Sequence, residues 1–302
     1  MTVDEHGLWS VTTAPLVPEL YGYTFVVDGV RMLDPLNSEV HANFTDLYSD
    51  ILVPGTPPAP WELTDIPHGD VTTHRFTTHI GIHYPENQTA YVVYTPPGYD
   101  AKRKVGYPVL YLLHGYTDSE EGWTETGRAN LMLDWMLAEG KIVPMIVVMP
   151  LGYGDFDFVT EGFKAWHEPV QVADNVDLYS KMLLTEIVPA VEHEYNIALG
   201  RENHAIAGLS MGGLESLTIG LKHSDEFAWV GGMSSAVFDA NNAMFEAYLP
   251  NLDAKKADLV EIRWPSGATD TLKDLDVNCL FVIQEGGKIL KTDKFSAAKK
   301  MS

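Results

Sequence analysis

The sequence predicts an α/β fold, in which a mostly parallel sheet carries helices on both faces, preceded by a separate β-rich segment. Continuous apolar runs alternate with helical stretches through the later part of the chain, a pattern typical of buried parallel strands. About the first 50 residues instead alternate apolar and polar side chains, as half-buried strands do. A chain of 302 residues is long enough for one large domain and a small one.

The first segment, residues 1–53, is predicted to be a β-domain. Apolar residues alternate with smaller or polar ones along residues 21–27. Asp28-Gly29 follows directly and is a strong signal for a two-residue hairpin turn. Five prolines then fall within the fourteen residues 54–67, which predicts an extended linker and a domain boundary.

The second segment, residues 68–302, is predicted to be the α/β domain. Its helices are expected at 129–139 and 177–195, and the second keeps the i, i+3, i+4, i+7 apolar spacing of an amphipathic helix. Pro189 lies inside that second stretch and should kink it. The strands are expected at five apolar runs, which are residues 108–113, 142–149, 205–209, 227–232 and 277–283.

Composition excludes several classes of partner. Lys and Arg total 20 against 42 Asp and Glu, so the net charge is −22. Such a surface repels phosphate backbones and anionic membranes, and we therefore expect neither nucleic acid nor a membrane as partner. No apolar run approaches the roughly 18 residues of a membrane helix. The single cysteine, Cys279, excludes an intrachain disulfide.

The motif that carries chemistry is Gly208-Leu209-Ser210-Met211-Gly212-Gly213, a G-x-S-x-G nucleophile elbow. A buried strand at 204–207 precedes it and a helix at 213–217 follows, which is the context that such an elbow requires. The glycines leave room for a serine on a tight, strained turn. Ser210 is therefore the predicted nucleophile, and the Met211 N–H is a predicted donor to an oxyanion.

A second oxyanion donor is expected in the loop after an earlier strand. The run from Tyr111 to Tyr116 contains a strand that ends in His114-Gly115, and the Tyr116 N–H is the candidate donor. His114 is interpreted as a structural imidazole that holds this loop, with a base or a ligand as the alternative. His167 lies in a loop expected near the top of the sheet, and it is either a replacement base or a surface or substrate-contacting histidine.

The histidine that should complete a catalytic triad is not identified. In α/β-hydrolases the order along the chain is Ser, then Asp or Glu, then His. The eleven histidines end at His223, thirteen positions after Ser210 and within the expected helix. At 1.5 Å per residue that places it on the order of 20 Å from the serine.

The chain resembles the esterase D-like carbohydrate esterases, a group that includes feruloyl esterases, acetyl xylan esterases and, more distantly, ferric enterobactin esterases. The resemblance covers roughly residues 61–283, and residues 7–31 resemble the immunoglobulin-like, glycogen-binding-type domain that often precedes these catalytic domains. The segments that carry the main resemblance are residues 107–115, Gly122-Trp123, residues 144–150 and residues 201–213.

The resemblance implies an α/β-hydrolase fold preceded by a partial β-sandwich. It also places the triad acid in the loop after residues 279–283, where this chain offers only Glu285 or Asp293. The family's histidine lies further on, and no equivalent is present. We interpret this as an incomplete copy of an esterase, whose domain lacks its C-terminal end, rather than a natural non-catalytic relative.

The implied function is hydrolysis of esters on plant cell-wall polysaccharides, with ferulate on arabinoxylan as the best single substrate and acetyl xylan as the alternative. The activity of this chain is expected to be impaired because the histidine is missing. No cofactor or metal is expected, since no cluster has ligand spacing. Family members are commonly secreted, although residues 1–6 show no signal peptide. The alternative from another class is a glycan-binding or scaffold protein without turnover.

Overall fold

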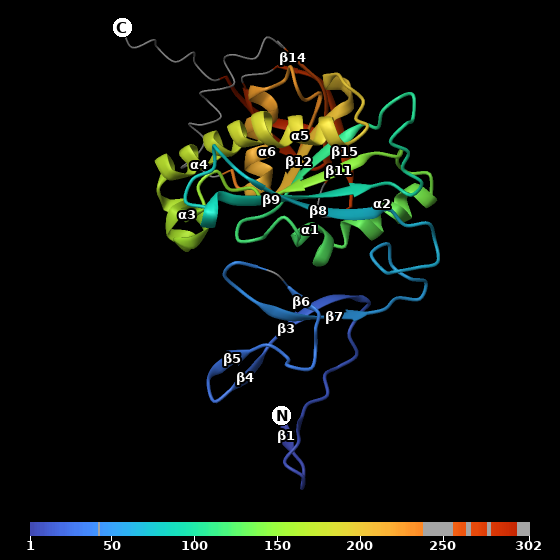
Figure 1. Cartoon of the computed structure of the whole chain (residues 1–302), viewed down its shortest axis with the longest axis vertical. Coiled ribbons are helices and arrows are strands. Elements are labelled where there is room, and N and C mark those ends of the chain that lie inside the picture. Colours follow the sequence, from blue (N-terminus) through green and yellow to red (C-terminus); the bar gives the residue numbers. More distant parts are fainter. Residues whose placement is uncertain (42, 238–255, 264–266, 277–278, 295–302) are drawn as a thin grey trace.

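A computed structural model describes residues 1–41, 43–237, 256–263, 267–276 and 279–294 (Figure 1). Its centre is a six-stranded sheet with the strand order β13-β12-β10-β11-β9-β8. The four strands β10 to β13 run parallel to one another. Strand β9 pairs antiparallel with β11, and β8 pairs antiparallel with β9. These strands are β8 (Asp70–Thr77), β9 (Gln88–Thr95), β10 (Val109–Leu113), β11 (Ile146–Pro150), β12 (His204–Leu209) and β13 (Trp229–Met233). The α/β-hydrolase fold predicted for the second segment is confirmed.

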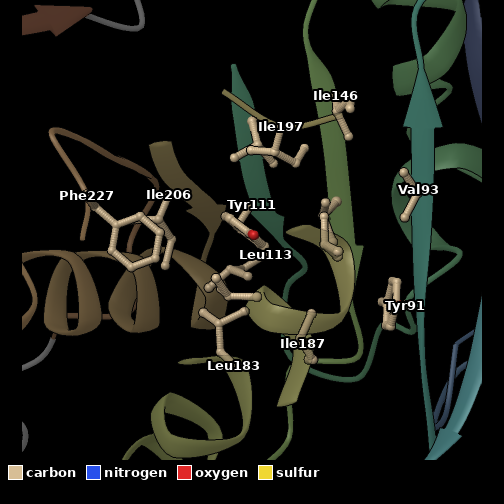
Figure 2. Close-up of a cluster of buried hydrophobic side chains, with 14 of the residues drawn as sticks. Tyr91, Val93, Tyr111, Leu113, Ile146, Leu183, Ile187, Ile197, Ile206 and Phe227 are labelled. Atoms are coloured by element: carbon tan, nitrogen blue, oxygen red, sulfur yellow. The ribbon is translucent and has the colours of Figure 1, made fainter. Parts of the chain in front are cut away.

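Helices cover both faces of this sheet (Figure 1). Alternate residues of β9 show the two faces, because Val93 joins one buried apolar cluster while Val92 and Tyr94 join another. The first cluster includes Tyr111 and Leu183 (Figure 2). The helices and helical turns are η1 (Pro85–Asn87), α1 (Gly122–Glu125), α2 (Ala129–Ala138), α3 (Asp157–Thr160), η2 (Gly162–His167), α4 (Pro169–Met182), η3 (Leu183–Ile187), α5 (Val188–Glu194), η4 (Arg201–Asn203) and α6 (Met211–Lys222).

The helix expected at 177–195 is longer and is interrupted. It begins at Pro169, and η3 between α4 and α5 is a π-helical turn. Pro189 occupies the first turn of α5, directly after η3. Proline has no N–H for the i→i−4 bond and its ring clashes with the carbonyl four residues earlier, so a local change of helical pitch is the expected response. The helix expected at 129–139 corresponds to α2.

The N-terminal segment forms small antiparallel sheets. The strands are β1 (Thr2–Val3), β2 (Trp9–Ser10), β3 (Glu19–Tyr23), β4 (Phe25–Val27), β5 (Val30–Met32), β6 (Val40–His41) and β7 (Tyr48–Val53). The predicted hairpin is confirmed, because Val27 pairs with Val30 and both Asp28 and Gly29 have positive φ. The strands β3, β7 and β6 form one sheet. Residues 54–69 contain no helix or strand, and the domain boundary and the immunoglobulin-like sandwich stay predictions.

For one predicted strand, the expected neighbour was wrong. Residues 277–283 were expected to join the parallel sheet, but β16 (Cys279–Gln284) pairs antiparallel with β17 (Lys288–Lys294) in a separate hairpin. A second hairpin joins β14 (Lys256–Arg263) to β15 (Thr269–Asp276). A continuous apolar run identifies a strand without identifying its neighbour, which explains the error. Among the described residues, no helix is both long and apolar enough to span a bilayer.

Candidate active site

The predicted nucleophile lies on a strained turn between β12 and α6. Ser210 has φ 54 and ψ −109, a backbone conformation that is rare for any residue except glycine. Its N–H donates to the Met233 carbonyl at 2.9 Å, and its carbonyl accepts from Leu214 and Ala236 at 3.0 and 2.9 Å. Three hydrogen bonds from the surrounding segments therefore hold the strained residue in place.

The two outer glycines of the motif are required by close backbone contacts. A methyl group added to Gly208 would lie 2.3 Å from the Gly212 carbonyl carbon. One added to Gly212 would lie 2.5 Å from the Leu113 carbonyl oxygen, at the end of β10. The Gly212 N–H donates to the His114 carbonyl at 3.0 Å. The motif thus brings the start of α6 directly against the loop that follows β10.

That loop also approaches the serine itself. A methyl group on Gly115 would lie 3.8 Å from Ser210 Cβ. Tyr116 follows, and its ring contacts Phe163 and Trp166 of η2, while its hydroxyl donates to the Phe158 carbonyl at 2.7 Å. The structure therefore places the residue chosen as second donor immediately after a glycine whose open side faces Ser210.

The first donor, Met211, is the first residue of α6 and is buried. The N–H groups in the first turn of a helix have no intrahelical acceptor, and they lie at the positive end of the helix dipole. The geometry is compatible with an oxyanion hole built from Met211 and Tyr116.

His114 is a buried structural group. It is 2% exposed, and both of its ring nitrogens are hydrogen-bonded, Nδ1 to the Gly115 carbonyl at 2.8 Å and Nε2 to the Gly152 N–H at 2.8 Å. Burial lowers its pKa, which favours the neutral ring that these two bonds require. His114 joins the segments that follow β10 and β11.

The other acid and base candidates lie in different parts of the fold. His167 is exposed at the end of η2, whose Trp166 packs against Tyr116. No hydrogen bond or ion pair joins His167 to Ser210 among the described residues. His223 caps the far end of α6, as expected.

The two acid candidates both lie in the C-terminal hairpin. Glu285 is in the turn after β16, and Asp293 is on β17 opposite Leu280. Their expected place beside the parallel sheet rested on the strand prediction that was wrong.

A cavity of about 240 Å³ lies beside the elbow, where Leu209 and Gly115 form part of its wall. The sequence did not indicate two of its lining residues, His41 and Asp118, whose Nε2 and Oδ1 atoms lie 3.4 Å apart. His41 comes from β6 in the N-terminal segment. No local pattern predicts a contact between residues so distant in sequence.

One group of side chains has the composition of a metal site. Candidate ligand atoms of His83, Asp155 and Asp157 all lie within 4.8 Å of one another. The His83 Nδ1 lies 2.7 Å from an Asp155 oxygen, and this hydrogen bond raises the histidine pKa. His83 Nδ1 also lies 3.3 Å from an Asp157 oxygen, so the histidine is paired with both carboxylates. His83 lies 72 positions before Asp155, so the sequence did not indicate the three residues as one cluster.

A buried carboxyl group lies beneath the site. Glu215 of α6 is 0% exposed, and neither of its carboxyl oxygens has a hydrogen-bond partner among the residues that the structure describes. A methyl group on Gly152 would lie 3.2 Å from Glu215 Oε2 and 3.4 Å from His114 Nε2, so the two side chains are close neighbours. Burial raises the pKa of Glu215 well above its ordinary value of 4.5.

We expect Glu215 to make the protein less stable as pH rises. Above 4.5 the unfolded chain loses this proton while the folded chain keeps it, so the free energy of unfolding falls until pH reaches the raised pKa. The slope is up to about 1.4 kcal/mol per pH unit. Glu215→Gln stays neutral in both states. In urea unfolding at pH 5, 6, 7 and 8, the free energy of unfolding of the variant should rise relative to that of the parent as pH increases. If the two free energies depend on pH in the same way, the expectation is wrong.

Comparison with known proteins identifies the family of this chain. The model of a family described as putative esterase matches residues 82–296. An endo-1,4-beta-xylanase/feruloyl esterase of Xylanibacter ruminicola is 32% identical over 241 residues, which are 78% of this chain and 31% of that protein. The diacylglycerol acyltransferase/mycolyltransferase Ag85A of Mycobacterium leprae is 33% identical over 140 residues, 45% of this chain and 38% of that protein. The chain thus spans about a third of the length of these curated relatives.

A similar solved structure is the CE1 ferulic acid esterase of Anaeromyces mucronatus. It superimposes with a TM-score of 0.50 at 28% identity, covering 58% of this chain and 62% of that chain.

Proposed function

Because the chain belongs to the esterase family, we propose that it hydrolyses carboxylic esters with Ser210 as nucleophile. The observation that carries the proposal is the strained Ser210 turn, held against the loop after β10 by the Gly212 N–H bond to His114. In the parallel part of the sheet, the segments that form this site follow the carboxyl ends of neighbouring strands, where ligands bind in open α/β sheets.

The reaction has two steps. Ser210 Oγ attacks the ester carbonyl carbon, its proton passes to a base, and the bond to the alcohol oxygen breaks as the alcohol leaves with a proton. Water then attacks the acyl-enzyme and releases the acid. The Met211 and Tyr116 N–H groups stabilise the negative oxygen in both steps. His167 is the remaining candidate for the base. It follows Trp166, whose ring packs against Tyr116.

The proposed substrates are hydroxycinnamoyl esters of plant cell-wall polysaccharides. This part rests on the relatives named feruloyl or ferulic acid esterase. The cavity of about 240 Å³ is lined by Leu209 and Gly115, next to the elbow, and is below the roughly 300–1,000 Å³ typical of ligand pockets. An extracellular location would follow from a cell-wall substrate and belongs to the same proposal.

A fluorophosphonate probe tests the proposed chemistry, because it modifies only a serine whose Oγ is activated. We expect one label, located by peptide mass spectrometry on Ser210, and none on protein denatured beforehand. Hydrolysis of methyl ferulate and p-nitrophenyl acetate then separates the substrate classes. Labelling of Ser210 with turnover of acetate alone would replace ferulate by acetyl esters, and no labelling would favour a binding protein without turnover.

A further inference from the structure

We infer that Asn43, which lies in the N-terminal segment, positions the oxyanion hole by holding the turn of residues 115–118. The inference rests on the proposed function only in assigning a catalytic role to Tyr116 within this turn. Asn43 and Asp118 are 75 positions apart in the sequence, and the Asn43 Nδ2 donates a hydrogen bond to Asp118 Oδ1 at 3.0 Å. An N-terminal residue is therefore part of the support of the site.

The turn contains a strained residue that needs outside support. Thr117 has φ 73 and is 8% exposed. Positive φ is a genuine outlier for a β-branched residue, and such a conformation persists only where the surrounding structure holds it. The turn is closed by the Asp118 N–H, which donates to the Gly115 carbonyl at 3.1 Å.

Each polar group of Thr117 is held, and two of these contacts come from the N-terminal segment. The Thr117 N–H donates to the Tyr153 hydroxyl at 2.8 Å. The Thr117 carbonyl accepts from the Phe44 N–H at 2.8 Å. The Thr117 hydroxyl oxygen accepts from Asn43 Nδ2 at 2.9 Å. The side-chain amide of Asn43 thus bridges the strained threonine and the carboxylate that follows it.

The consequence reaches the reacting atoms through Tyr116. This residue lies between Gly115, where an added methyl group would lie 3.8 Å from Ser210 Cβ, and Thr117, which Asn43 holds. The direction of the Tyr116 N–H depends on the backbone angles of this turn. A donor that is held in advance stabilises the developing oxyanion without reorganisation. Asn43 is accordingly a positioning residue.

Asn43→Ala tests the inference, with Asn37→Ala as matched control. Asn37 also donates two hydrogen bonds from its amide, to the Tyr23 hydroxyl at 3.0 Å and the Asp50 carbonyl at 2.7 Å, both within the N-terminal segment. We expect Asn43→Ala to lower kcat for p-nitrophenyl acetate about 10- to 100-fold and to leave KM unchanged. This loss does not exceed the roughly 100- to 1,000-fold loss that follows when one whole oxyanion donor is removed. Asn37→Ala should leave both constants at the parent value.

Asn43→Asp separates the amide donor from the other role of this side chain. Asn43 Oδ1 also accepts from the Thr45 and Asp46 N–H groups, at 3.0 and 3.2 Å. Aspartate keeps these two acceptor contacts but places a second carboxylate beside Asp118. We expect a loss in kcat at least as large as in Asn43→Ala. A near-parental rate in Asn43→Asp would overturn the inference. It would mean that the acceptor contacts of residue 43 with Thr45 and Asp46 matter, and not the hydrogen bonds that its amide donates to Thr117 and Asp118.

Hydrogen exchange gives a readout that does not need activity. Peptides covering residues 114–121 should exchange faster in Asn43→Ala than in the parent and in Asn37→Ala, while peptides covering residues 204–214 stay unchanged. If the parent shows no turnover and this change appears, the proposed function fails and the role of Asn43 in holding the turn stands. Unchanged exchange of residues 114–121 would overturn the inference whatever the activity.

Discussion

Ser210→Ala is expected to lower ester hydrolysis at least about 100-fold and to remove fluorophosphonate labelling. Without Oγ no acyl-enzyme forms, and the oxyanion donors act only on direct attack by water. Loss of the nucleophile from a complete serine protease triad lowers kcat by about 10⁶. No histidine is hydrogen-bonded to Ser210 among the described residues, so the parent rate should be lower and the ratio smaller, at least about 100-fold.

The measurement is hydrolysis of methyl ferulate and p-nitrophenyl acetate at equal concentrations of both proteins. Thermal unfolding serves as the control, since the loss of one hydroxyl from the half-buried Ser210 should leave the fold intact. If the parent and Ser210→Ala hydrolyse both esters equally fast, Ser210 is not a nucleophile. If turnover disappears in the variant, His167→Ala is the next comparison, because a base must then exist and His167 lies on the segment packed against Tyr116.

The parts of the fold that could be predicted are those specified by local sequence. The elbow needs a strand, two glycines around a serine and a helix, all within residues 204–222. The Asp28-Gly29 turn and the interruption of the helix near Pro189 likewise depend on the backbone preferences of one or two residues. Such signals do not require knowledge of a distant partner, and the structure contains all three.

The parts that could not be predicted depend on pairing between distant segments. Within the expected run at 277–283, residues 279–283 belong to strand β16, yet its neighbour is β17 and not the parallel sheet, and residues 277–278 lie outside the described residues. The strands β8 and β9, which complete one edge of the sheet, were not anticipated. β8 is a largely exposed edge strand without an apolar run, whereas β9 contains the buried apolar run of residues 90–94 and was missed despite it. The contact of Asn43 with Asp118 joins two loops whose sequences carry no mark of each other.

Gly212→Ala is expected to destabilise the protein by about 3 kcal/mol or more, the upper end for overpacking, and to lower labelling of Ser210 at least about 100-fold. The added methyl would lie 2.5 and 2.6 Å from the carbonyl oxygens of Leu113 and His114. Both are backbone atoms at the end of the central strand β10, so no side-chain rotation relieves the contact. Either α6 moves away from β10 or the loop does.

Each of these movements changes the site. The Gly212 N–H bond to the His114 carbonyl at 3.0 Å would lengthen, and the turn beside Ser210 would shift with it. Gly231→Ala is the matched control, because its added methyl would meet Ala207, at 3.2 Å from Cβ and 4.0 Å from Cα, and no atom of the elbow, so it should destabilise the protein less, by about 1 kcal/mol, and leave labelling unchanged. Urea unfolding and the labelling rate measure both effects. A Gly212→Ala protein as stable and as reactive as Gly231→Ala would show that the close approach of α6 to β10 does not build the site.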